Sequence, residues 1–159
     1  MKNTLESTKL DVEGFALIGA CIVRFNQIFA ILSVFIKLKD PEKELNKLFA
    51  GTGDNMVKKI KSNYGEELAN EFEKLKNDRN KIAHGLLFSN KELNGIFYIH
   101  KDKHGTETNI DREFTADFLK NCDSFFVKTI TTCGTQNTQI ASLVVETWNE
   151  TVENMKEQK

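Results

Sequence analysis

Residues 66–85 read EELANEFEKLKNDRNKIAHG, and this stretch carries the clearest structural pattern of the chain. Apolar side chains recur there at spacings of three and four, on a face that also includes an arginine: Leu68, Phe72, Leu75, Arg79 and Ile82. That period predicts an amphipathic helix over residues 66–84. Gly85 then stands where a left-handed residue ends many helices.

Three more helices are predicted before this one. Residues 10–39 are apolar on most sides, as in the central or interface helix of a bundle. The Asp40-Pro41 pair interrupts that pattern, and Pro41 suits the first turn of a short helix that stops at Gly51. Asp54 is expected to cap the third helix.

Beyond Gly85 the pattern changes from helix to strand. Short stretches separated by turn-like sequence predict two or three strands, at residues 86–89, 95–100 and 106–110. They make a small β-hairpin insert over about residues 86–110, which is too small to fold alone. Helical signals return at Thr115, which is expected to cap a helix ending near Cys133, and a last helix is predicted near residues 137–155.

The predicted fold is therefore mainly α, a helical bundle with a small hairpin insert, in a single domain over residues 1–159. With 40% hydrophobic residues the chain can build one core. Its 22 Lys and Arg against 23 Asp and Glu give a net charge of -1. That balance excludes a strongly basic surface over the whole molecule, so any nucleic-acid contact must come from a local patch.

The sequence also bears on compartment. Residues 1–13 are too polar and acidic for a signal peptide. Arg24, Asn26 and Gln27 interrupt the apolar stretch of residues 10–39, which favours a buried helix over a membrane span. The 3 cysteines form no Cys-x-x-Cys motif and are typical of free thiols in a reducing cytoplasm. We expect a cytoplasmic protein without membrane contact, and no metal or cofactor motif is found.

One segment carries a chemical signal: NDRNKIAHG at residues 77–85 places Arg79, Asn80 and His84 near the end of the predicted helix. Asn80 and His84 are four apart and share a helix face, whereas Arg79 and His84 are five apart and lie off alignment. Histidine can take and give a proton near neutral pH, and arginine stabilises charge on phosphate oxygens. Without carboxylates or metal ligands, this pair suits metal-independent RNA cleavage in which the 2′-hydroxyl is the nucleophile.

The same segment resembles the signature of the HEPN superfamily, an Arg followed by four to six residues and a His, commonly with Asn directly after the Arg. The four-residue version is found here, as Arg79-Asn80-Lys81-Ile82-Ala83-His84. The resemblance is close over this motif and loose over the order of the helices. It implies an all-α bundle of four or five helices that dimerises and joins two motifs in one cleft.

Active members of that superfamily are RNases of toxin–antitoxin, abortive-infection and other antiphage systems. On this resemblance Arg79 and His84 would be catalytic, and Asn80 would orient them. Lys81, beside the motif, is a candidate contact for substrate phosphate. The resemblance and the broad apolar surface of residues 10–39 together predict an obligate homodimer with a composite site that takes RNA as substrate.

Two alternatives concern the motif itself. Arg79 and His84 can instead form a structural polar pair that closes the helix end with acids such as Asp78 or Glu73. The domain can also be a non-catalytic HEPN-like module that binds a partner protein, such as a nucleotidyltransferase antitoxin or a defence effector. A protein partner would need no basic surface.

A third alternative is a metal site in the hairpin. His100 and His104 flank a turn with Asp102 between them. Two histidines without a convincing third ligand are more often solvated, so no metal is predicted. Lys58, Lys59 and Lys61 are similarly more typical of a solvated helix face than of an RNA-steering patch.

Overall fold

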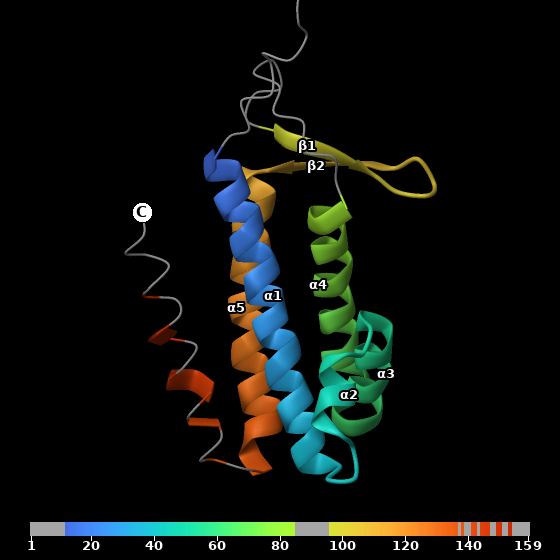
Figure 1. Ribbon diagram of the computed structural model, residues 1–159, viewed down its shortest axis with the longest axis vertical. Helices are drawn as coiled ribbons and strands as arrows, with labels where there is room; N and C mark the ends of the chain where they lie inside the picture. The colour runs from blue at the N-terminus through green and yellow to red at the C-terminus, as the bar shows by residue number, and fades with distance from the viewer. Residues whose placement is uncertain are drawn as a thin grey trace, which may run out of the picture. The chain divides into compact units, whose positions relative to one another are not determined.

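The computed structural model describes residues 12–84, 96–136, 138, 141, 142, 144–146, 149, 150 and 153. These residues are mainly helical, with a small two-stranded antiparallel sheet (Figure 1). The elements are, in order, α1 (Val12–Lys39), α2 (Leu45–Phe49), α3 (Gly53–Tyr64), α4 (Glu66–His84), β1 (Ile96–Lys101), β2 (Glu107–Asp111), α5 (Arg112–Cys133) and a 3-10 turn (Gly134–Gln136). The predicted mainly α fold with a hairpin after the motif helix is confirmed.

The chain packs into two compact units, which are described separately. Unit 1 comprises the described residues of Met1–Gln27 and Glu73–Asp123, and unit 2 those of Ile28–Phe72 and Ser124–Lys159. Each of α1, α4 and α5 contributes one segment to each unit. The single domain predicted over residues 1–159 stays a prediction.

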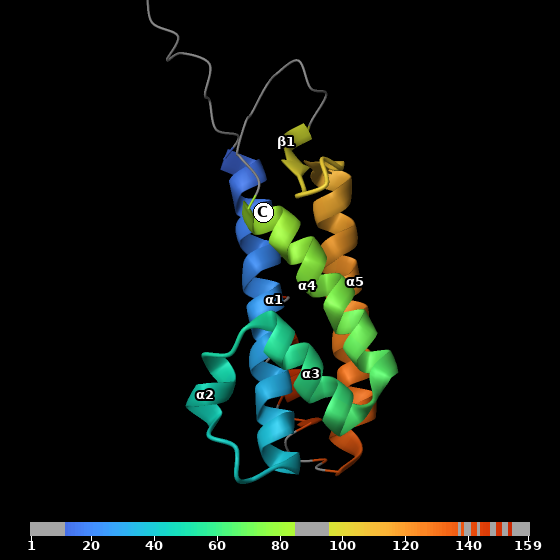
Figure 2. The same ribbon diagram turned by 90° about the vertical axis from the view of Figure 1, so that its right-hand side faces the viewer.

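Unit 1 holds three helical segments and the hairpin. α1 and α5 begin, and α4 ends, at the end of the unit that carries β1 and β2 (Figures 1 and 2). Among its described side chains the buried apolar ones are Ile18, Cys21, Phe25, Leu75, Ile82, Ile110, Phe118 and Cys122. Polar contacts join α1 to α5, because the Cys21 thiol donates to the carbonyl of Thr115 at 3.7 Å and Arg24 pairs with Asp123 at 3.7 Å.

The junction between β2 and α5 corrects one prediction. The helix begins at Arg112, and Asp111 caps it by accepting the backbone N–H of Phe114 at 2.8 Å. Thr115 lies buried inside the first turn, where its hydroxyl donates to the carbonyls of Asp111 and Arg112, each at 3.0 Å. An Asp that ends a paired strand satisfies the free N–H groups earlier than Thr115 can, so the predicted cap at Thr115 is wrong.

Unit 2 has a core rich in phenylalanine. Its buried apolar side chains are Ile28, Leu32, Phe35, Ile36, Leu48, Met56, Ile60, Leu68, Ala69, Phe72, Phe125, Phe126 and Cys133. The ring of Phe72 from α4 lies 6.3 Å from that of Phe29 in α1 and 6.0 Å from that of Phe125 in α5. At the surface, Lys128 of α5 contacts the carboxylates of Glu67 and Glu71 in α4, each at 2.6 Å.

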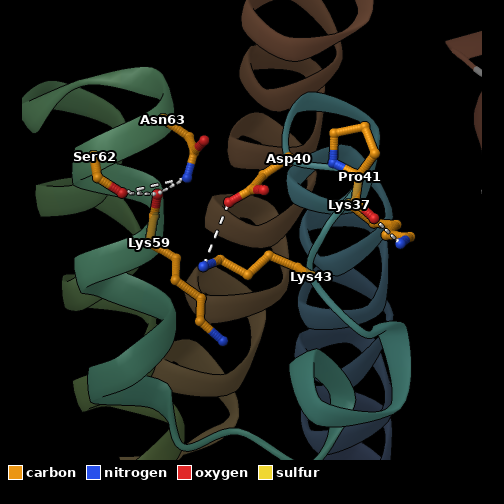
Figure 3. A network of polar contacts seen from close by, with 7 residues as sticks. All are labelled: Lys37, Asp40, Pro41, Lys43, Lys59, Ser62 and Asn63. Carbon is orange, nitrogen blue, oxygen red and sulfur yellow. Dashed lines mark hydrogen bonds and ion pairs between the residues drawn. The ribbon is translucent and has the colours of Figure 1, made fainter.

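The connection after α1 differs from its prediction. Pro41 lies in a turn, with the Lys43 N–H bonded to the Asp40 carbonyl at 3.1 Å and the Lys43 side chain paired with the Asp40 carboxylate at 3.4 Å (Figure 3). Lys37 also donates to the Pro41 carbonyl. These contacts hold the turn, and α2 starts only at Leu45, so the expectation that Pro41 opens this helix is wrong.

The start and end of α3 show two further local signals. Thr52 caps the helix by accepting the N–H of Asn55 at 3.3 Å, so Asp54 lies in the first turn and the predicted cap at Asp54 is wrong. Thr and Asp both commonly cap helices, and here Thr52, two positions before Asp54, is the cap. At the other end Gly65, with φ 99°, separates α3 from α4, in agreement with the helix start predicted at residue 66.

Several predictions lie outside the described residues. They are the left-handed cap at Gly85, the strand at residues 86–89, and much of the last helix near residues 137–155. The described residues of that last stretch are helical. The predicted end of the preceding helix at Cys133 is confirmed.

α1 is long and apolar enough over Gly14–Lys39 to cross a membrane by length and composition, a property that core helices of soluble proteins share. All three cysteines are buried free thiols. Burial raises the pKa of Cys21 and of Cys133 to about 12, and it also raises the pKa of Cys122.

Candidate functional site

The motif occupies the last turns of α4, in unit 1. The helix has the predicted bounds, Glu66–His84, because its apolar residues keep the helical period and its ends complement the helix dipole. Glu66 and Glu67 lie in the first turn, and Lys81 and His84 in the last. All four candidate residues therefore lie on one continuous helix.

Arg79 is half-buried and held from two sides. Its Nη1 donates to the Oδ1 of Asn80 at 3.4 Å, and its guanidinium lies 5.9 Å from the ring centroid of Phe25 in α1. The Nε atom of Arg79 is buried and has no hydrogen-bond partner among the described residues. The side chain is thus positioned, with its Nε covered by the protein and the guanidinium as a whole only half-buried.

Asn80 directly contacts Arg79, as the resemblance implies for an orienting residue. The contact is long for a hydrogen bond to a guanidinium. Asn80 is itself half-buried.

His84 is exposed at the very end of α4. It lies five positions after Arg79, which in a regular helix is about 7.5 Å along the axis and about 140° around it. Within the described residues no hydrogen bond or ion pair joins the two side chains, so they share a helix end without meeting. A single α4 helix therefore carries both the guanidinium and the imidazole, but it does not direct them to the same point.

Lys81 is engaged within the protein. Its Nζ lies 3.0 Å from the Asp78 carboxylate, one turn back, and 5.9 Å from the ring centroid of Phe114 in α5. Lys81 is half-buried in this arrangement. A phosphate contact by Lys81, as predicted, would have to share this lysine with Asp78.

The two acids considered as partners for Arg79 pair with lysines instead. Asp78 contacts Lys81 at 3.0 Å, and Glu73 lies 3.6 Å from the Nζ of Lys76. Both contacts join residues three apart on α4; Lys76 is buried and Glu73 exposed, whereas Lys81 and Asp78 are half-buried. Neither acid neutralises the guanidinium of Arg79, which leaves its positive charge available to an anion.

The hairpin histidines are separated by the turn. His100 lies in β1, half-buried and paired with Thr108, whereas His104 is exposed in the turn. Asp102 accepts the N–H groups of His104 and Thr106, each at 2.8 Å, and the bond from Thr106 is the main cause that lowers its pKa. Among the described residues no group of three or more His, Cys, Asp or Glu side chains is placed to hold a metal ion.

Phe25 and Phe114 are the parts of this site that the sequence analysis did not identify. Both rings lie under cations of the motif, yet they come from α1 and α5. No local pattern marks either residue, because each looks like an ordinary apolar position of its own helix. Only the packing of three helices brings them to the motif.

Comparison of this chain with family models, with curated proteins and with solved structures finds no match.

Proposed function

We propose that this chain is a HEPN-like endoribonuclease that cleaves RNA without a metal ion, in the cytoplasm, as part of a prokaryotic toxin–antitoxin or phage-defence system. The observation that carries the proposal is the state of Arg79. A half-buried guanidinium that neither Asp78 nor Glu73 neutralises suits an incoming phosphate oxygen.

The chemical roles follow from where each side chain lies. Arg79 binds and neutralises the phosphate at which negative charge develops, with Phe25 and Asn80 limiting its orientation. His84, exposed at the helix end, takes the proton from the RNA 2′-hydroxyl or gives one to the leaving 5′-oxygen. The oxygen of the 2′-hydroxyl attacks the adjacent phosphorus, the bond to the 5′-oxygen breaks, and the products carry a 2′,3′-cyclic phosphate and a 5′-hydroxyl.

A homodimer completes this site in the proposal. One α4 places Arg79 and His84 about 140° apart around its axis, so a second copy is needed to bring an Arg and a His to the same phosphate. The outer side of α1 in unit 1 offers a surface for that pairing, because Phe15 and Val23 are 37% and 49% exposed and Gly19 between them has open space above it.

Cleavage of a labelled total-RNA or single-stranded RNA substrate by the purified protein tests the proposal. His84→Ala and Arg79→Ala should each lower cleavage by at least about a hundredfold, as expected for loss of an acid–base group or of charge stabilisation. His104→Ala is the matched control, since it removes an exposed imidazole elsewhere in unit 1. Unchanged cleavage by both motif variants would reject the assignment.

A non-catalytic interaction module is the second candidate. The observation that favours it is the exposed apolar side of α1, which suits a protein partner such as an antitoxin or defence effector as well as a second copy. A stable one-to-one complex with a neighbouring gene's product, formed by a protein that cleaves no RNA, would support this candidate. Val23→Asp should then disrupt the complex.

A further inference from the structure

The β-hairpin lies at the same end of unit 1 as the motif. It follows α4 in the chain, and β2 continues without a linker into α5, where Asp111 caps the helix. Both views place β1 and β2 at the end of this unit where α4 terminates (Figures 1 and 2). Ile110 of β2 is fully buried, which anchors the hairpin to the unit.

The strand register divides the hairpin into two faces. Thr108 and Ile110 are two residues apart on β2 and lie on one face, and His100 pairs with Thr108, so His100 shares that face. The opposite face carries Ile99 paired with Asn109, and Lys101 paired with Glu107. Because Ile110 is fully buried, the face that it shares with His100 is the one turned toward the unit.

Burial along the two faces agrees with that assignment. His100 and Thr108 are half-buried, whereas all four residues of the opposite face are exposed: Ile99, Lys101, Glu107 and Asn109. The pair of His100 and Thr108 lies two residues, about 7 Å, along the strand from the buried Ile110. It therefore stands at the rim of the covered face, accessible in part to a ligand.

We infer that this inner face of the hairpin is a second wall of the RNA site, and that His100 contacts the RNA strand beside the cleaved phosphate. This inference rests on the proposed endoribonuclease function. An imidazole can stack on an unpaired base or donate to a phosphate, and the Thr108 hydroxyl next to it can bond a 2′-hydroxyl or phosphate oxygen. The ligand assigned to this face is single-stranded RNA.

The hairpin offers a matched control for this inference. His104 is exposed in the turn, and the turn itself is held by Asp102, whose carboxylate accepts two backbone N–H groups. Replacing His104 removes the same functional group from the same hairpin without touching the inner face. His100→Gln, which keeps hydrogen-bonding capacity at similar size, tests whether loss of contact rather than loss of folding causes an effect.

Binding of a fluorescently labelled single-stranded RNA is measured by anisotropy, with every variant made in the His84→Ala background so that little RNA is cleaved during the measurement. His100→Ala should weaken binding about tenfold, His100→Gln less, and His104→Ala by less than twofold. In the background that retains His84, His100→Ala should raise KM by a similar factor and leave kcat within about twofold. Far-UV circular dichroism and the melting temperature confirm that each variant is folded.

The outcomes separate this inference from the proposed function. If the protein cleaves RNA but His100→Ala binds RNA as tightly as His104→Ala, the second wall is refuted and the endoribonuclease stands. If RNA binding depends on His100 but no RNA is cleaved, the endoribonuclease is refuted and the RNA-binding face stands. If the protein neither binds nor cleaves RNA, both are refuted.

Discussion

Phe72 offers the sharpest test of how the helices of unit 2 are packed. Its side chain is 0% exposed and lies between the rings of Phe29 and Phe125, at centroid distances of 6.3 and 6.0 Å. Truncating a fully buried phenylalanine to alanine removes about 3–5 kcal/mol of folding free energy, through lost burial and the cavity that is left. Phe72→Ala should therefore destabilise the protein by about 4 kcal/mol.

Urea unfolding followed by far-UV circular dichroism measures this change. With a slope of about 2 kcal/mol/M, the midpoint should fall by about 2 M, and the melting temperature by about 10 °C. Val127→Ala is the control, because that side chain is 63% exposed and should change stability by less than about 0.5 kcal/mol.

A milder variant covers the case in which Phe72→Ala does not fold. Phe72→Leu nearly keeps the volume but loses both ring contacts, each worth about 0.5–1.5 kcal/mol, so a loss of about 2 kcal/mol is expected. If Phe72→Ala unfolds within 1 kcal/mol of the Val127→Ala control, the aromatic packing described for α1, α4 and α5 is wrong.

Three further changes have defined outcomes. Asp111→Ala removes the cap of α5 and should destabilise the protein by about 1 kcal/mol in urea unfolding, whereas Asn109→Ala on the exposed hairpin face should have little effect. The hydrogen bond from Lys128 lowers the pKa of Glu67 in the folded protein. The contact therefore stabilises the fold at any pH above the pKa that Glu67 has in the unfolded chain. This stabilisation is lost as the pH falls through the lower pKa of the folded state. Lys128→Met should accordingly melt below the wild-type protein at pH 7, with a difference that shrinks by about pH 3; a constant difference would contradict the pair. The three buried thiols should resist a thiol reagent at pH 8 and all react in guanidinium, and one that reacts rapidly in the native protein would contradict its burial.

The motif helix was predictable because a single local pattern specifies it. Apolar residues at helical spacing and the Gly65 break determine both its path and its start, and the structure has the predicted bounds, Glu66–His84. The hairpin was predictable from its turn-like sequence, because the short stretches on either side of Asp-Lys-His-Gly form strands at Ile96–Lys101 and Glu107–Asp111.

The helix caps were less predictable, because the sequence offers two cap residues close together at each start. Asp111, not Thr115, caps α5, because strand pairing keeps the chain extended as far as Asp111. At α3 the cap is Thr52 rather than Asp54. Tertiary contacts and the preceding turn decide between candidates that are equivalent by residue type alone.

The surroundings of the site were the least predictable part. The sequence places Arg79, Asn80, Lys81 and His84 on one helix, but not the rings from other helices beneath two of them. It also does not show that Lys81 is shared with Asp78, because both are common surface residues at a spacing of three. Contacts between distant helices depend on packing that no short pattern records.

The chemistry of the RNA ends tests the central claim most directly. Wild-type protein and His84→Ala are incubated with a defined single-stranded RNA in the presence of EDTA, and the product ends are analysed by mass spectrometry. The account predicts that the wild-type protein leaves 2′,3′-cyclic phosphate and 5′-hydroxyl ends, and that His84→Ala forms them at least about a hundredfold more slowly. Cleavage that EDTA abolishes, or cyclic-phosphate ends formed equally fast by His84→Ala, would contradict it.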